Sequence, residues 1–168
     1  MKPLDDLLER LRKSGIPIEN EVAEAMQQVF IGSFTDFELD AFWHDRPVPF
    51  LITQNDAAKT ISAPHMIATL LHHLELLVGQ HVLLIGAKGG YLAALIDHIV
   101  GKDGMVTVLE PHQEVQYHTE ERLEFHESKG TIRVLPVHSL EDNDEATRGI
   151  DRVLITGAVR EIPLTVAG

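Results

Sequence analysis

The sequence predicts an α/β fold, in which a doubly wound parallel sheet of about four strands follows a helical N-terminal lead. Apolar runs of strand length recur after residue 80 and lack the alternation typical of half-buried strands. Stretches with helical spacing stand between these runs, and a glycine turn joins the first run to the next helix. Alternating strands and helices favour crossover connections and therefore a parallel sheet.

The 168 residues fit one compact domain with a sizeable core. Within it we expect a helical lead and connector over residues 1–58 and an α/β core over residues 59–168. The lead contains two amphipathic helices, at residues 4–13 and 19–30, separated by a Gly-Ile-Pro break. Residues 34–56 mix aromatic residues, acids and prolines without a clear period, which predicts an irregular connector able to reach over a ligand site.

A stronger helix is predicted at residues 64–77, where leucine and isoleucine repeat on one face and Pro64 occupies the first turn. It leads into a βαβ unit at residues 81–111. In that unit a buried strand (82–85) meets a turn with three glycines, a helix follows at 91–100, and a second strand at 105–110 ends in Glu110. A carboxylate at this edge of a parallel sheet can accept hydrogen bonds from a ribose diol.

The remaining elements are a glutamate-rich helix at residues 111–129, a third strand at 131–136, an acidic loop at 141–148 and a fourth strand at 151–156. The usual doubly wound order, 3-2-1-4, puts the fourth strand at an edge, although its apolar run suits burial on both faces. We therefore expect a cover for that edge: a second copy in a homo-oligomer, the N-terminal helices, or a C-terminal segment missing from this chain.

Composition excludes several classes of protein. No apolar run approaches membrane-spanning length, and the first residues lack the pattern of a signal peptide. A net charge of −12, with 26 acidic and 14 basic residues, makes nucleic acid an unfavourable ligand. The absence of cysteine favours a cytoplasmic setting.

Several segments carry a family resemblance. They are LLERLRKSGI, the helix containing EAM, HDRPVP, TISAPHMIATLL, the glycine turn with Tyr91, Glu110 and DRVLITGAVREIP. In order and approximate spacing they resemble the protein-L-isoaspartate O-methyltransferases, which use S-adenosylmethionine to methylate the isoaspartyl carboxylate of damaged proteins. The resemblance covers most of the chain, and TISAPHM is its most specific part.

This resemblance implies a Rossmann-like parallel sheet of the class I methyltransferase type, incomplete here, with S-adenosylmethionine as cofactor and isoaspartyl proteins or peptides as substrates. It implies a catalytic role for Ser62, which takes the place of a serine beside the sulfonium methyl group. The residues it assigns to the cofactor are Thr60, Gly86, Lys88, Gly90, Glu110 and His138. A substrate carboxylate is already ionised at neutral pH, so methyl transfer needs alignment and a dry site rather than a general base.

The sequence departs from the family's pattern in four places. In the glycine turn, Leu84 replaces an acid that helps hold the methionine end of the cofactor, and Lys88 replaces the middle glycine, where it either obstructs the ligand or pairs with its carboxylate. Val137-His138 replaces a Gly-Asp pair whose acid contacts the adenine amino group. Lys59 ends the segment NDAAK, which replaces a glycine-containing lead, and three further strands of the family are absent.

Several hypotheses remain open at this point. The chain is a carboxyl methyltransferase, a non-enzymatic relative that keeps the fold as a binding or structural module, or a module that uses Lys88 to bind another anionic nucleotide. A nicotinamide dehydrogenase also stays open, although the pattern G-x-G-x-x-G fails at Lys88. The segment TISAPHM also has a purely structural interpretation, in which Ser62 is a helix N-cap and His65 is a surface residue of the first turn. The ten histidines lack the spacing of a metal site, so we expect no metal.

Overall fold

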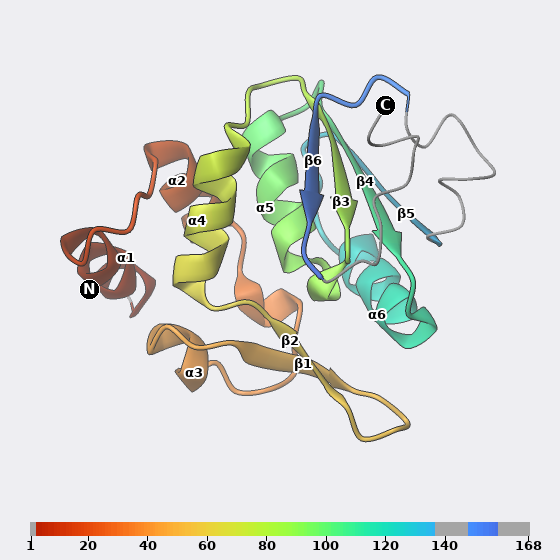
Figure 1. Cartoon of the computed structure of the whole chain (residues 1–168), viewed down its shortest axis with the longest axis horizontal. Helices are drawn as coiled ribbons and strands as arrows, with labels where there is room; N and C mark the ends of the chain where they lie inside the picture. The colour runs from red at the N-terminus through yellow and green to blue at the C-terminus, as the bar shows by residue number, and fades with distance from the viewer. Residues whose placement is uncertain (1–2, 137–147, 158–168) are drawn as a thin grey trace.

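The computed structural model describes residues 3–136 and 148–157, and its centre is a four-stranded parallel sheet (Figure 1). The strands are β3 (His81–Ile85), β4 (Met105–Glu110), β5 (Thr131–Pro136) and β6 (Arg152–Ile155). Their order in the sheet is β5-β4-β3-β6, with parallel pairing at every interface. The predicted parallel sheet and its 3-2-1-4 order are therefore confirmed.

The central strands are apolar because both of their faces are covered. Every β3 residue from Val82 to Ile85 is buried, as is β4 from Val106 to Glu110. In β6 only Leu154 is fully buried. Within the described part of the chain β6 is an edge strand, and the expected cover for that edge stays a prediction.

Six helices accompany the sheets in the described chain. They are α1 (Pro3–Lys13), α2 (Asn20–Gln28), α3 (Asp40–Trp43), α4 (Pro64–Leu74), α5 (Tyr91–Val100) and α6 (Gln113–Glu124). Short 3-10 turns occur at η1 (Ile31–Ser33) and η2 (Lys88–Gly90). Figure 1 shows α1, α2, α4 and α5 on one side of the parallel sheet, and α5 is buried between the sheet and α2. None of the described helices combines the length and apolarity needed to cross a bilayer.

The last part of the connector predicted to be irregular, residues 34–56, contains the first strand of an antiparallel hairpin, and the second strand follows just beyond it. Its strands are β1 (Val48–Ile52) and β2 (Ala58–Ile61). Prolines at 47 and 49 and a register shift between Pro49 and Leu51 disrupt the alternation that would reveal a strand in the sequence. The prediction of irregular structure was therefore wrong here.

Three helices end earlier than their apolar spacing suggested. α4 ends at Leu74 because Glu75 adopts a left-handed backbone conformation (φ +50°), which cannot continue a helix. α2 ends at Gln28, and α6 ends at Glu124 rather than 129. The thin apolar face of α6 buries only Val115 and Thr119, so tertiary packing gives little support to a longer helix.

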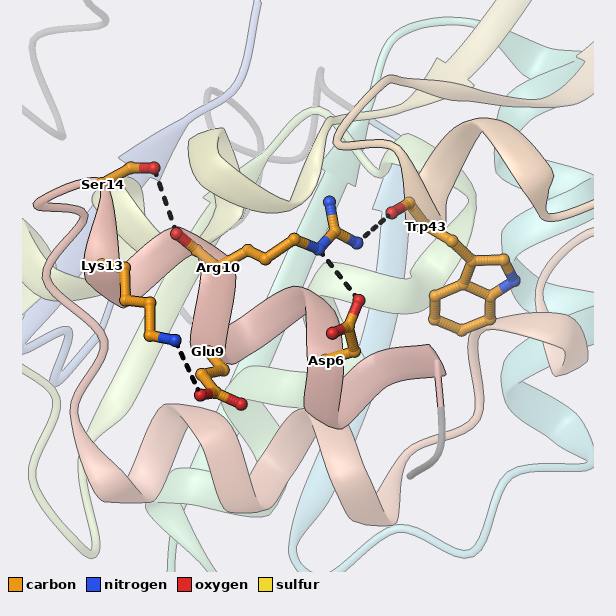
Figure 2. A network of polar contacts seen from close by, with 6 residues as sticks. All are labelled: Asp6, Glu9, Arg10, Lys13, Ser14 and Trp43. Atoms are coloured by element: carbon orange, nitrogen blue, oxygen red, sulfur yellow. Dashed lines mark hydrogen bonds and ion pairs between the residues drawn. The ribbon is translucent and has the colours of Figure 1, made fainter.

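One hydrogen bond of the network in Figure 2 links α1 to α3. Arg10 Nε donates to Asp6 at 2.9 Å, while Arg10 Nη2 donates to the carbonyl oxygen of Trp43 at 2.8 Å. Lys13 and Glu9 form a second exposed pair at 3.0 Å. Exposed pairs one turn apart contribute about 0.2–0.5 kcal/mol each, so the bond to Trp43 matters more for how the lead docks.

Candidate functional site

A cavity of about 300 Å³ lies at the C-terminal ends of β3, β4 and β6. The hairpin, the glycine turn η2 and the start of α6 supply its other walls. Open parallel sheets bind ligands at this edge, and the volume is at the lower end of the range for small-molecule pockets. Figure 1 shows the hairpin beside the end of the sheet to which the strand arrows point.

Four of the predicted cofactor residues line this cavity: Thr60, Gly86, Lys88 and Glu110. Gly90 does not line it, because its Cα faces the core, where an added Cβ would lie 3.2 Å from the ring of Phe34. His138 lies outside the described residues.

Two glycines of the turn are required by packing. Gly86 has φ +100°, and the Thr156 hydroxyl occupies the space that a Cβ would need while it donates to the Gly86 carbonyl oxygen at 3.0 Å. Gly89 has φ +80°, and an added Cβ would lie 2.9 Å from Cγ of Phe50. The end of β6 and the hairpin thus both close against a turn that tolerates no side chain at these positions.

Glu110 clamps the backbone around the cavity. This side chain is 7% exposed; Oε1 accepts the Ala87 N–H at 2.8 Å and Oε2 accepts the His112 N–H at 2.8 Å. A carboxylate oxygen can accept more than one hydrogen bond, so capacity for a diol remains. Glu110 therefore joins the glycine turn to the start of α6 and still presents acceptors to a ligand.

Two lysines bring positive charge to the same cavity. Lys59 comes from β2 and Lys88 from the glycine turn, and both are partly buried. Among the described residues, neither forms an ion pair with a carboxylate. Burial, followed by the neighbouring charge of Lys59, lowers the pKa of the Lys88 ammonium. An anionic ligand would relieve both effects.

Ser62 follows β2 and is partly buried outside the cavity lining. The N-cap of α4 is Ala63, so the interpretation of Ser62 as the N-cap is wrong. Asp45 supplies the missing cap, since its carboxylate accepts the His65 N–H at 2.8 Å and also contacts the His65 ring at 2.9 Å. The Ser62 hydroxyl has no hydrogen-bond partner among the described residues and is available to a ligand.

Sequence reasoning missed several residues of the cavity. Phe50 lines it and packs its ring 4.9 Å from that of His118. His112 also lines it, with an Nδ1 atom that is buried and has no hydrogen-bond partner in the described structure. Lys59, which the sequence presents as a departure from the family's pattern, lines the cavity too. The one remaining signal of the hairpin wall in the sequence is the pair of apolar residues Val48 and Phe50, two positions apart on either side of Pro49, and the structure buries both.

Comparison with known proteins places these features in context. The family model described as protein-L-isoaspartate(D-aspartate) O-methyltransferase matches residues 2–167. A protein-L-isoaspartate O-methyltransferase of Ignicoccus hospitalis is 32% identical over 159 residues, which cover 94% of this chain and 72% of that protein. The enzyme of the same name from Methanopyrus kandleri is 32% identical over 164 residues, covering 94% of this chain and 67% of the relative.

Solved structures of the same name share the fold. One protein-L-isoaspartate O-methyltransferase superimposes with a TM-score of 0.82 at 22% identity and covers 98% of this chain. This chain spans 51% of that structure's length. A second, from Plasmodium falciparum in complex with S-adenosyl-L-homocysteine, has a TM-score of 0.75 at 23% identity, covering 99% of this chain and 78% of the other. The Rossmann-like methyltransferase fold expected from the sequence is therefore confirmed.

Proposed function

This chain belongs to the protein-L-isoaspartate(D-aspartate) O-methyltransferase family, and we propose that it is an S-adenosylmethionine-dependent carboxyl methyltransferase acting on isoaspartyl residues of proteins or peptides. The observation that carries the proposal is the convergence of Thr60, Gly86, Lys88 and Glu110 on one cavity at the ligand-binding edge of the sheet. These residues come from the hairpin, the glycine turn and the end of β4.

The residues present fit the cofactor at two of its groups. Glu110 keeps acceptor capacity for a ribose diol after binding two backbone N–H groups. Lys88 and Lys59 offer positive charge to a carboxylate. Leu84, at the place of the family's acid, is fully buried and apolar, so it offers nothing to the cofactor's ammonium.

Bound S-adenosylmethionine supplies an electrophilic methyl group on its sulfonium. The chain has to align the accepting carboxylate and exclude water, because no proton is removed from an ionised acid. Alternate residues of an extended segment share a face, and Thr60, which lines the cavity, precedes Ser62 by two positions. We assign to the Ser62 hydroxyl a hydrogen bond to the substrate carboxylate, with Thr60 beside it.

A second candidate is a catalytically impaired relative that keeps the fold as a binding module. Two features favour it: Leu84 is buried in the core and offers no polar group to the cofactor, and Lys88 adopts a left-handed backbone (φ +51°) in the cavity lining. A homo-oligomer that covers the edge of β6 stays a prediction. A cytoplasmic location also stays a prediction, and the cysteine-free composition favours it.

Two measurements test the proposal. Calorimetry with S-adenosylhomocysteine should detect binding, and an isoaspartyl peptide should accept a labelled methyl group in the presence of S-adenosylmethionine. The same peptide with an ordinary aspartyl residue serves as the control substrate. No binding at millimolar ligand would overturn the proposal, whereas binding without methyl transfer would favour the impaired relative.

A further inference from the structure

Lys59 and Lys88 meet in the cavity although they belong to separate elements. Lys59 lies on β2 of the hairpin and Lys88 in the glycine turn after β3. The hairpin docks on this turn through Phe50, whose ring covers Gly89. Tertiary packing therefore places two ammonium groups at one site, which their separation in the sequence does not reveal.

No described carboxylate forms an ion pair with either lysine. Glu110 is the one acid among the described lining residues, and both of its oxygens hold backbone N–H groups at 2.8 Å. Neither lysine pairs with any other described acid. Two like charges in a partly buried site repel each other unless a counter-charge arrives.

Three further observations support a ligand at this site. Lys88 adopts φ +51°, a conformation that costs a residue with a side chain about 1 kcal/mol and that clusters at ligand sites, and among the described lining residues it is the one non-glycine residue with this backbone. His112 contributes a buried Nδ1 atom without a partner in the described structure. Burial and the charge of Lys59 both lower the pKa of Lys88, which is expected for a partly buried cation that has no anionic partner in the described structure.

We propose that Lys59 and Lys88 together bind one anionic group of the ligand, so that the cavity selects adenosine compounds with a carboxylate or phosphate tail over those with an uncharged tail. This selectivity rests on the proposed function, which supplies the adenosine part of the ligand. The methionine-derived tail of S-adenosylmethionine and S-adenosylhomocysteine also carries an ammonium group. The only carboxylate among the described lining residues is Glu110, which already accepts two backbone N–H groups and is assigned to the ribose. ADP, which carries anionic charge alone, is therefore expected to bind at least as tightly as S-adenosylhomocysteine.

Four probes separate the anion from the adenosine. Calorimetry uses 5′-methylthioadenosine (adenosine with an uncharged tail), S-adenosylhomocysteine (carboxylate tail), ADP (phosphate tail) and inorganic pyrophosphate (anion alone). The proteins are the wild type, Lys59→Gln, Lys88→Gln, the double variant and Lys102→Gln, an exposed lysine outside the cavity. Each single change in the pair should weaken S-adenosylhomocysteine and ADP by about tenfold, because each removes one charged hydrogen bond.

The control and the neutral probe complete the expected pattern. Lys102→Gln should leave every affinity unchanged, and methylthioadenosine should bind all five proteins alike. Pyrophosphate should raise the Tm of the wild type but not that of the double variant, which gives a readout independent of adenosine. The double variant should keep the wild-type circular dichroism, because neither lysine side chain forms a described hydrogen bond or ion pair.

The outcomes distinguish the two proposals. If methylthioadenosine binds while the lysine variants bind S-adenosylhomocysteine and ADP as the wild type does, the lysine site is wrong and the cofactor site stands. If pyrophosphate binds through the lysines while no adenosine compound binds, the proposed function fails and the anion site remains. Binding of ADP much weaker than that of S-adenosylhomocysteine would overturn the selectivity for purely anionic tails.

Discussion

The Asp45 carboxylate accepts the backbone N–H of His65 at 2.8 Å and thereby caps a helix that begins 19 residues later, at Pro64. Asp45 belongs to the segment HDRPVP and His65 to TISAPHM. Two segments that carry the family resemblance are therefore parts of one contact. The contact holds the entry of α4, and with it the chain at Ser62, against the segment that leads into the hairpin.

Replacing Asp45 should destabilise the fold. Asp45→Ala removes the cap of α4, and loss of a cap costs about 0.5–2 kcal/mol. Asp56→Ala is a matched control, because Asp56 has nearly the same left-handed backbone (φ +60° against +59°) without a described side-chain hydrogen bond. Urea unfolding of both variants measures the difference. Equal losses of unfolding free energy would mean that the contact with His65 contributes nothing.

Ser62→Ala should reduce methyl transfer with little effect on stability or on S-adenosylhomocysteine affinity. The Ser62 hydroxyl has no partner in the described structure, so its loss leaves nothing unsatisfied. A lost hydrogen bond to a charged carboxylate corresponds to about 10- to 100-fold in rate. Ser33→Ala, at an exposed serine, is the control. Unchanged transfer rates in Ser62→Ala would remove this residue from the proposed mechanism.

Glu110→Gln should lower both stability and cofactor affinity. An amide keeps one oxygen, but its NH₂ group then faces one of the two backbone N–H donors at Ala87 and His112. Leaving one such buried donor unpaired costs about 1–3 kcal/mol. Thermal melting and calorimetry measure the two effects, with the exposed Glu124→Gln as the control. A Glu110→Gln variant as stable as Glu124→Gln would contradict the clamp.

Lys88→Gly should separate stability from binding. Glycine adopts φ +51° without strain, so the variant is expected to gain about 0.5–1 kcal/mol of unfolding free energy. It should lose affinity for S-adenosylhomocysteine, because one cation of the pair is gone. Chemical unfolding of the variant tests the gain in unfolding free energy, and calorimetry on the same protein tests the loss of affinity. Tighter binding would show that the lysine obstructs the cavity.

Stability should fall on mild acidification. Burial lowers the pKa values of His81, His118 and His126 below their ordinary value of 6.5. Unfolded chains then take up protons near pH 6.5 that the folded chain takes up only at lower pH, so the unfolding free energy decreases as pH falls below about 7. It levels off once the folded histidines are also protonated.

Urea titrations from pH 7.5 to 5, at a salt concentration that screens the net charge of −12, measure this slope. His118→Gln should flatten it, since a neutral amide can still donate to the Phe34 carbonyl oxygen that now accepts from His118 Nε2 at 2.9 Å. A stability that is constant or higher at pH 5.5 than at pH 7.5 would contradict the assignment.

Much of the parallel core follows from local signals. Apolar runs without polar alternation predict buried strands. The glycine turn at Gly86, followed by a helix, predicts the crossover that makes β3 and β4 parallel neighbours. Glu110 could be assigned from its place at a strand end, because the edge of a parallel sheet is fixed by topology. These inferences need no knowledge of distant contacts.

The missed features depend on contacts between distant segments. The hairpin is hidden by Pro49 and its register shift. Asp45 caps α4 from outside that helix, so a search for caps in the adjacent sequence finds only Ser62. Lys59 and Lys88 form a pair only because the hairpin folds over the glycine turn. Local pattern reasoning has no access to such packing.

The contact between Phe50 and Gly89 also constrains how the family can vary. The phenyl ring occupies the space that a side chain at position 89 would need, so the two positions cannot change independently. A relative with alanine at the position of Gly89 would require a smaller residue than phenylalanine at the position of Phe50, or a hairpin displaced from the turn. Paired variation at these two positions would therefore identify which relatives share this wall of the cavity.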